Sequence, residues 1–474
     1  MVKNNDEIVK YIQNQIAQSN AKTLSYILDE NGEKNPKRYL YPKINKHIKN
    51  FLKGQQEPRW VTIPGIRGVG KTTLLAQLFD AQKIPQKNKL FLSIDQTIQY
   101  LGIPLDKVLE AYEDILGVVF EKLDEPVILF LDEIQYEKNW GIILKTIYDR
   151  SKKVFVVSTG SSAISLQTNT DIARRTILKK LYPMSFTEYL RIKGGKVKTR
   201  GLSEKIKKAL FESNSAKEVF SSLKKLQPEI RDFWIGIDRQ EMDKYIKYGT
   251  LPFTVGLRDE FLIYEQIKKL LEKVVNSDIA KMKNFTPNTI SKIPSLLYLI
   301  ANSDELSLRN VSKTLSVSIT TVDEILEALV QAEVIYKVPS YGTAYKQARK
   351  PAKYVFSTPA FRAMYFNFSS KIDQGDKGKL LEDLVSLYLV SFLDEKVNTS
   401  LVYDSSKVGA DFILQFGSQK IALEVGYGEK DFKQLSKTLD RVKAKYGLNI
   451  SKNSLSLSKE ENSVNVPLET FLLI

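Results

Sequence analysis

The sequence predicts an α/β protein in which a parallel-sheet core comes first, a helical region follows, and a smaller α/β module ends the chain. Three observations favour this fold class. Short apolar runs alternate with helical stretches between Arg59 and about Leu190, which is typical of a buried parallel sheet covered by helices. A glycine-rich loop joins the first apolar run to the first helical stretch. From about Phe186 the pattern turns helical and more polar, and it changes again over roughly the last hundred residues.

The composition is typical of a globular protein and excludes several kinds of site. Of the 474 residues, 43% are hydrophobic and 27% are charged, and the length suggests about three domains. The chain has no cysteine, which excludes disulfides, thiolate metal ligands and cysteine nucleophiles, and its single histidine, His47, argues against a Ser-His-Asp hydrolase. Because there is no run of about 18 apolar residues and no apolar N-terminal stretch, we expect no membrane span, no signal peptide and a cytoplasmic location.

The core is expected at residues 56–195, after a polar N-terminal segment, residues 1–55, whose pattern is helical. The alternation of strands and helices in the core predicts a doubly wound sheet. The strands are expected at Trp60–Pro64, Leu90–Asp95, Val127–Asp132 and Val154–Thr159. The helices are expected at Lys71–Phe79, Leu105–Leu123 and Trp140–Tyr148.

The glycine-rich loop of the core predicts a nucleotide site. Residues 65–72 read GIRGVGKT, which matches the phosphate-loop pattern G-x-x-x-x-G-K-[ST] at every fixed position, between a strand and a helix. Glycines let successive N–H groups point at phosphate oxygens, and the helix N-terminus adds its positive end. Lys71 is expected to reach the β- and γ-phosphates and Thr72 to bind Mg²⁺. ATP and Mg²⁺ are therefore the expected ligands, and the expected binding residues are Gly65, Gly68, Val69, Gly70, Lys71, Thr72 and Thr73.

Two adjacent carboxylates, Asp132 and Glu133, end the third expected strand. Ligands of open α/β sheets bind at the carboxyl ends of the strands, so both side chains are expected beside the phosphate loop. Asp132 would hold Mg²⁺ through water, and Glu133 would orient and activate the attacking water. A glutamate in this position favours hydrolysis over transfer, and the expected catalytic residues are Glu133, Lys71 and Asp132.

Further side chains are candidates for sensing the γ-phosphate. Thr159 ends the fourth apolar run and Ser161 follows it, and they either sense the phosphate or cap the next helix. Arg174 and Arg175 are candidates for a charge-stabilising arginine, in the same chain or from a neighbouring subunit. An ordinary pair of surface arginines is the alternative.

Residues 286–370 have the pattern of a winged helix, after an expected helical lid or linker at residues 196–285. A first helix ends at Ser295–Ala301, a second spans Leu308–Leu315, and Ser318 is expected to cap a third at Ile319–Ala332. Two β-rich runs follow, joined by a loop that carries glycine and lysine: Val334–Pro339 and Lys353–Phe356.

Four segments, in this order and spacing, resemble a known family: GIRGVGKTTLL (65–75), LDEIQ (131–135), STGSS (158–162) and LYPMSFTEY (181–189). The family is the AAA+-type ATPases of archaea and bacteria that carry a winged helix and a C-terminal restriction-endonuclease-like domain. The resemblance resumes at Lys353–Phe356, Gly378–Glu382, Asp411–Phe412 and Glu424, and it covers most of the chain past residue 40. It implies ATP binding and hydrolysis, and a link to DNA. AAA+ proteins often form rings, so a homo-oligomer is possible on this resemblance.

The C-terminal module, residues 371–474, departs from the nuclease pattern that the resemblance implies. That pattern needs a helix Glu, a strand Asp and then Glu-x-Lys on the next strand, with the carboxylates binding Mg²⁺. Glu382, Asp411 and Glu424 are present, but Gly426 stands where the lysine is required. We therefore expect a degenerate nuclease site and no metal-dependent DNA cleavage, unless Lys420 on the same strand replaces the missing lysine. Cleavage that Asp411→Ala abolishes would contradict this expectation.

The charge distribution leaves the partner open. The net charge of +16 permits non-specific DNA binding, and the expected hairpin tip carries Lys346, Arg349 and Lys350 beside tyrosines. The third helix of the winged helix carries only acidic charges, which is unfavourable against phosphates. Two functions follow from the sequence: a DNA-associated ATPase, or an ATP-regulated switch that acts on protein partners. An active ATP-dependent nuclease is disfavoured by Gly426.

Overall fold

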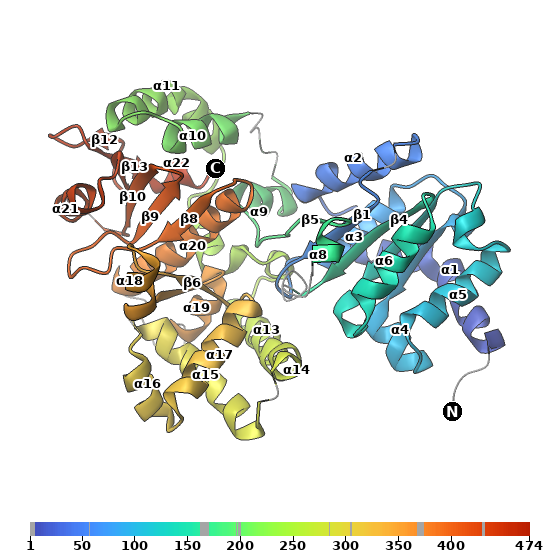
Figure 1. The fold of residues 1–474 in the computed structure, drawn as a ribbon. Helices are drawn as coiled ribbons and strands as arrows, with labels where there is room; N and C mark the ends of the chain where they lie inside the picture. Colours follow the sequence, from blue (N-terminus) through green and yellow to red (C-terminus); the bar gives the residue numbers. More distant parts are fainter. Residues whose placement is uncertain are drawn as a thin grey trace. The chain divides into compact units, whose positions relative to one another are not determined.

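The computed structural model shows a chain that divides into two compact units, Met1–Tyr182 and Pro183–Ile474 (Figure 1). It describes residues 5–55, 57–161, 170–195, 197, 201–283, 285–303, 306–366, 374–428 and 432–474. Over these residues, no helix is long and apolar enough to cross a membrane.

The first unit contains a five-stranded sheet in the order β2-β3-β4-β1-β5, and every pairing in it is parallel. The strands are β1 Trp60–Pro64, β2 Lys89–Ser93, β3 Val127–Asp132, β4 Val154–Gly160 and β5 Ile177–Leu178. The first four are buried along their whole length, as continuous apolar runs require. The expected parallel sheet is thus confirmed, and β5 is a short strand that the sequence pattern did not indicate.

Helices cover both faces of this sheet. On one face Phe51 of α2 packs on Phe155, and Phe79 of α3 packs on the rings of Phe91 and Phe130. The other face carries alternating aliphatic side chains that pack with α5 and α6 in one core. The helices are α1 Asn5–Ile27, α2 Leu40–Leu52, α3 Lys71–Asp80, α4 Ile94–Leu101, α5 Leu105–Leu116, α6 Trp140–Arg150 and α8 Thr170–Ala173. Short 3₁₀ turns lie at Gln86–Asn88, Phe120–Lys122 and Ile134–Tyr136.

Two boundaries in the first unit differ from the sequence pattern. The second strand ends at Ser93 because Ile94 and Asp95 begin α4, whereas the apolar pattern extended the strand to Asp95. The helix that begins at Leu105 ends at Leu116, because Gly117 adopts a left-handed conformation with φ 75° and stops the helix.

The second unit begins with helices and ends with a mixed sheet. The helices are α9 Phe186–Ile192, α10 Leu202–Phe211, α11 Ala216–Trp234, α12 Gln240–Lys244, α13 Glu260–Lys273, α14 Ala280–Met282, α15 Pro287–Asn302, α16 Leu308–Leu315, α17 Ile319–Gln331, α18 Ala344–Arg349, α19 Pro359–Phe366, α20 Gln374–Asp394, α21 Lys433–Val442 and α22 Leu468–Phe471. Two π-helical turns, Tyr245–Gly249 and Val274–Ile279, and a 3₁₀ turn, Pro252–Thr254, connect some of them.

Strands β6 Ile335–Val338 and β7 Lys353–Phe356 form an antiparallel pair that follows α15, α16 and α17. Ser318 caps α17 by accepting a hydrogen bond from the Thr321 N–H, as its position predicted. The segment between β6 and β7 contains α18 instead of the expected loop. Thr343 accepts a hydrogen bond from the Lys346 N–H, and the sequence AYKQAR that follows has no helix breaker.

The C-terminal sheet has six strands in the order β12-β13-β11-β10-β9-β8. Strands β8, β9 and β10 pair antiparallel, whereas β11 is parallel to both β10 and β13. The strands are β8 Thr399–Val402, β9 Phe412–Phe416, β10 Gln419–Val425, β11 Tyr446–Ser451, β12 Ser456–Leu457 and β13 Ser463–Pro467. Helix α21, Lys433–Val442, precedes β11 and ends where Lys443 adopts a left-handed conformation.

The chain passes from one unit to the other within three residues. The carbonyl of Tyr182 accepts a hydrogen bond from Arg38 at 2.7 Å, inside the first unit. The N–H of Met184 donates to the Thr250 carbonyl at 2.7 Å, inside the second unit. The connection between the units is therefore Tyr182–Pro183–Met184, with no longer linker.

Candidate functional site

The glycine-rich loop leaves β1 and enters α3 in a conformation that favours glycine. Gly68 and Gly70 have φ values of 80° and 90°, which L side chains rarely adopt. At Gly65 a Cβ atom would lie 2.5 Å from the carbonyl oxygen of Leu181, so close packing requires glycine there. The three glycines of the motif are thus explained by backbone conformation at two positions and by contact at the third.

The Lys71 ammonium lies inside the curl of this loop. Its Nζ donates to the carbonyl oxygens of Gly65 at 2.9 Å and Ile66 at 3.2 Å, and the residue is only 5% exposed. Both acceptors are neutral, so the positive charge remains available to an anion in the loop.

A second buried cation supports the loop from the N-terminal segment. Arg38 donates to the carbonyl of Val69 at 2.6 Å and to that of Tyr182 at 2.7 Å. Val69 belongs to the phosphate loop, so the guanidinium fixes the loop backbone to the end of the unit. Sequence reasoning missed Arg38, because its two partners lie far away in the chain and no motif marks it.

Thr72, Asp132 and Thr159 meet at the carboxyl ends of β3 and β4. The Thr72 hydroxyl donates to Asp132 Oδ2 at 2.7 Å, and the Thr159 hydroxyl donates to Oδ1. Burial raises the pKa of Asp132 above its ordinary value, and the two hydroxyl donors oppose this rise. A hydroxyl and a carboxylate in contact are the hard oxygen ligands that Mg²⁺ prefers, so the donor set fits this metal.

Glu133 follows in a strained, left-handed conformation with φ 55°. Its carboxylate accepts a hydrogen bond from the Gln135 amide, and the Gln135 oxygen accepts one from the Ser161 N–H at 3.2 Å. The N–H of Glu133 donates to the Thr159 hydroxyl at 3.2 Å. Gln135 therefore ties Glu133 to the end of β4. It stands within the LDEIQ segment, but nothing in the sequence pattern assigns it a role.

The two arginines that are candidates for sensing the γ-phosphate, Arg174 and Arg175, have other surroundings. Arg175 donates to both carboxylate oxygens of Asp149 on α6, at 2.8 and 3.0 Å, so this ion pair sets its position. Arg174 is exposed. Thr73 lies half-buried in the first turn of α3, beside Thr72. The roles assigned to Ser161, Arg174 and Arg175 stay predictions.

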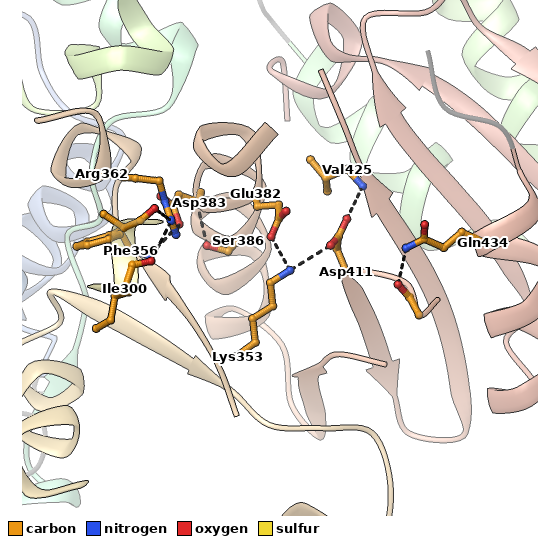
Figure 2. Close-up of polar contacts among 12 residues, drawn as sticks. Ile300, Lys353, Phe356, Arg362, Glu382, Asp383, Ser386, Asp411, Val425 and Gln434 are labelled. Carbon is orange, nitrogen blue, oxygen red and sulfur yellow. Dashed lines mark hydrogen bonds and ion pairs between the residues drawn. The ribbon is translucent and has the colours of Figure 1, made fainter. Parts of the chain in front are cut away.

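In the second unit, two of the three acidic candidates meet a lysine from the β6–β7 hairpin (Figure 2). The Lys353 ammonium lies 2.5 Å from Glu382 Oε2 and 3.1 Å from Asp411 Oδ1. Glu424 is buried on β10, at 2% exposure. Lys420, the alternative donor, instead donates to the Tyr341 hydroxyl at 2.6 Å and the Val442 carbonyl at 2.9 Å. Among the described residues, no group of three or more acidic or histidine side chains is arranged to hold a metal ion.

The basic candidates lie on and after α18. Lys346, Arg349 and Lys350 are all exposed. The Arg349 guanidinium lies 4.9 Å from the ring centre of Tyr345, whose side chain is 67% exposed. On α17, Glu327 pairs with Lys283 at 3.7 Å.

Comparison with known families agrees with the geometry of the first unit. Residues 57–190 match the family described as "AAA domain". Residues 239–371 match a second family, described as a domain of unknown function (DUF8612). The parallel sheet, the phosphate loop and this match define the first unit as a P-loop domain of the AAA class.

The chain resembles two uncharacterized proteins of Methanocaldococcus jannaschii. It is 34% identical to the uncharacterized protein MJ1637 of Methanocaldococcus jannaschii, over 100% of this chain and 95% of that protein. The chain belongs to the same family as MJ1637. It is also 23% identical to MJ1544 of the same organism, over 80% of this chain and 79% of that one. Among solved structures, the ORC1 protein of Aeropyrum pernix in complex with DNA is similar with a TM-score of 0.32 and 12% identity, over 69% of this chain and 91% of that one.

Proposed function

We propose that this protein binds Mg·ATP in its AAA domain and hydrolyses it, and that DNA phosphates bind to the second unit. The observation that carries the first part is the contact between the Thr72 hydroxyl and the Asp132 carboxylate, 2.7 Å apart beside the loop that holds Lys71. A metal ligand pair next to a buried ammonium is the arrangement that a nucleoside triphosphate and its cation require.

Each side chain of the site has a role in this proposal. Lys71 and the loop N–H groups hold the phosphates, and Thr72 and Asp132 hold Mg²⁺, which when bound neutralises phosphate charge. Glu133 accepts a proton from the attacking water, and Gln135 fixes the direction of the Glu133 carboxylate. Thr159 orients Asp132 by donating to its second oxygen.

The test is the steady-state ATPase rate of the purified protein, with and without DNA. We expect Mg-dependent turnover that Lys71→Ala abolishes together with nucleotide binding, since the ammonium is lost. Glu133→Gln should abolish turnover and retain binding, because the amide cannot accept the proton. Turnover that survives both substitutions, or no turnover by the wild-type protein, would overturn the proposal.

The finer architecture of the second unit is part of the proposal. Residues 286–370 form a winged helix in which α15, α16 and α17 precede the β6–β7 hairpin. Residues 371–474 form a restriction-endonuclease-like domain that does not cleave DNA. The position equivalent to the nuclease lysine is Gly426, and the Lys420 ammonium is bonded to Tyr341 and Val442 instead of a carboxylate.

DNA association is supported by the exposed basic side chains of α18 and by the net charge of +16. An aromatic ring stacked with arginine at the surface, as in Tyr345 and Arg349, adds a face on which bases or sugars can pack.

A second function is favoured by α17. Asp323, Glu324 and Glu327 make this helix acidic, and an acidic face suits a basic protein surface better than it suits DNA. The alternative is thus an ATP-regulated switch that captures a protein partner. An ATPase rate that does not respond to DNA, together with ATP-dependent capture of a partner that charge reversal on α17 abolishes, would favour the switch.

A further inference from the structure

Lys353 lies where three parts of the second unit meet. It is the first residue of β7 in the hairpin, Glu382 lies on α20, and Asp411 directly precedes β9 of the C-terminal sheet. The two carboxylates converge on the single ammonium (Figure 2). All three side chains are largely buried, with exposures of 13%, 23% and 15% for Lys353, Glu382 and Asp411.

In this cluster, hydrogen bonds occupy both carboxylate oxygens of Asp411, which would otherwise face a divalent cation. Asp411 Oδ1 accepts from Lys353, and Asp411 Oδ2 accepts from the Val425 N–H at 2.9 Å. Two carboxylates close together in a buried place require a positive charge between them, and the lysine provides it.

The negative charges of Asp411 and Glu382 favour the protonated form of Lys353. Burial alone would lower the pKa of Lys353, but Asp411 and Glu382 outweigh burial and the net pKa is raised. The two carboxylates therefore favour the charged form of Lys353.

We propose that the Lys353 ammonium is a built-in cation that takes the place of a divalent metal between Glu382 and Asp411. The cluster then serves as an ion-pair joint between the hairpin and the C-terminal sheet. It involves residues that the ATPase proposal does not use, so either inference can fail without the other.

Other contacts fasten the same hairpin, so loss of Lys353 alone should leave the fold intact. The Phe356 N–H donates to Asp383 on α20 at 2.8 Å. At the other end, the Tyr341 N–H donates to the Tyr403 carbonyl at 2.7 Å, and the Tyr403 N–H donates to the Pro339 carbonyl at 3.0 Å.

The test is calorimetric titration of the full-length, nucleotide-free protein with MnCl₂. The wild-type protein should show no Mn²⁺ binding that depends on Asp411. Lys353→Met should create one site, with an affinity at least about tenfold above the wild-type protein, because two carboxylates lose their cation and can accept another. Adding Asp411→Asn to Lys353→Met should remove the gain.

Lys420→Met is the matched control. Lys420 also joins the hairpin to the C-terminal sheet, but its partners are a hydroxyl and a carbonyl, so its removal should create no Mn²⁺ site. Lys353→Arg keeps a cation and should behave as the wild-type protein.

Two results would overturn the proposal: Mn²⁺ binding by the wild-type protein that Asp411→Asn removes, or a folded Lys353→Met variant that binds no more Mn²⁺ than the wild-type protein. The comparison of wild type with Asp411→Asn needs no lysine variant, so it decides the question even if Lys353→Met fails to fold. Mn²⁺-dependent DNA cleavage that Asp411→Ala abolishes would count against the proposal in the same way.

Discussion

The Asp132 carboxyl group is buried, and burial of its charged form has a cost that can be measured. Because burial raises its pKa in the folded protein, the folded state binds the proton more tightly than the unfolded state does. The stability linked to this proton is complete below the ordinary aspartate pKa, about 3.9. It is lost as the pH rises through the raised pKa of the folded state.

We therefore predict that Asp132→Asn raises the melting temperature of the nucleotide-free protein at neutral pH while it impairs Mg²⁺-dependent turnover. The difference between variant and wild type should shrink as the pH falls towards the ordinary aspartate pKa. Melting curves of both proteins across this pH range measure the effect. A variant that is less stable than wild type at neutral pH would mean that the bonds from Thr72 and Thr159 outweigh the cost of burial.

Gln135 permits a separate prediction, because its amide connects the Glu133 carboxylate to the Ser161 N–H. Gln135→Leu keeps the size of the side chain but removes both hydrogen bonds. We predict that kcat falls by about ten- to a hundredfold, since Glu133 loses its fixed direction, while KM for ATP changes little. An increase in KM with kcat unchanged would assign Gln135 to ATP binding instead.

Among individual residues, the sequence predicted the roles of the side chains that belong to a contiguous motif. Lys71, Thr72, Asp132 and Glu133 were candidates because their spacing from strands and glycines has a known physical meaning. Arg38 and Lys353 were not assigned these contacts, because Arg38 binds a carbonyl 144 residues away and Lys353 binds a carboxylate 58 residues away. Such pairs follow from the tertiary structure, which local pattern does not encode.

Helices and strands were predictable where one local signal dominated. The apolar runs of β1, β3 and β4 and the cap of α17 at Ser318 are examples. Strand β11 was missed because its sequence, YGLNIS, mixes glycine and asparagine into a strand that is buried between β10 and β13. Its burial depends on these neighbours and not on its own pattern.

Helix α18 permits a prediction about DNA. Arg349→Glu replaces an exposed cation beside Tyr345 with an anion, so non-specific DNA affinity should fall for all sequences alike. The slope of log affinity against log salt concentration should become shallower by about one unit for each phosphate that the variant no longer binds. Fluorescence anisotropy with labelled duplexes at several salt concentrations measures both quantities.

Lys225→Glu makes the same change of charge at an exposed position on α11 and serves as the control. Equal losses of affinity for the two variants would mean that α18 contributes only to the overall positive charge and is not a specific site for DNA phosphates. An affinity that does not depend on salt would contradict phosphate binding altogether.

Over the whole molecule, the two units carry different kinds of chemistry. The first holds the proposed nucleotide site, with Lys71 and Asp132 buried beside one loop, and the second holds the ion-pair joint at Lys353. The fold class of the first unit followed from its sequence, because the strands of a buried parallel sheet are continuous apolar runs that alternate with helices. The division after Tyr182 did not, since no proline- or glycine-rich linker marks it.

The connection between the units, Tyr182–Pro183–Met184, is short, and the main chain is hydrogen-bonded at both of its ends. Between the Tyr182 carbonyl and the Met184 N–H only the φ and ψ angles of Pro183 can turn, and the proline ring fixes φ, so few rotations separate these two groups. Arg38 links that carbonyl to Val69 in the phosphate loop, and Met184 is bonded to Thr250, whose hydroxyl contacts that of Thr358 just after β7. Two glycines inserted after Tyr182 would lengthen this connection and add freely rotating dihedral angles to it. We predict that the insertion leaves basal ATP turnover intact and abolishes any stimulation by DNA; stimulation that persists would show that the signal travels by another route.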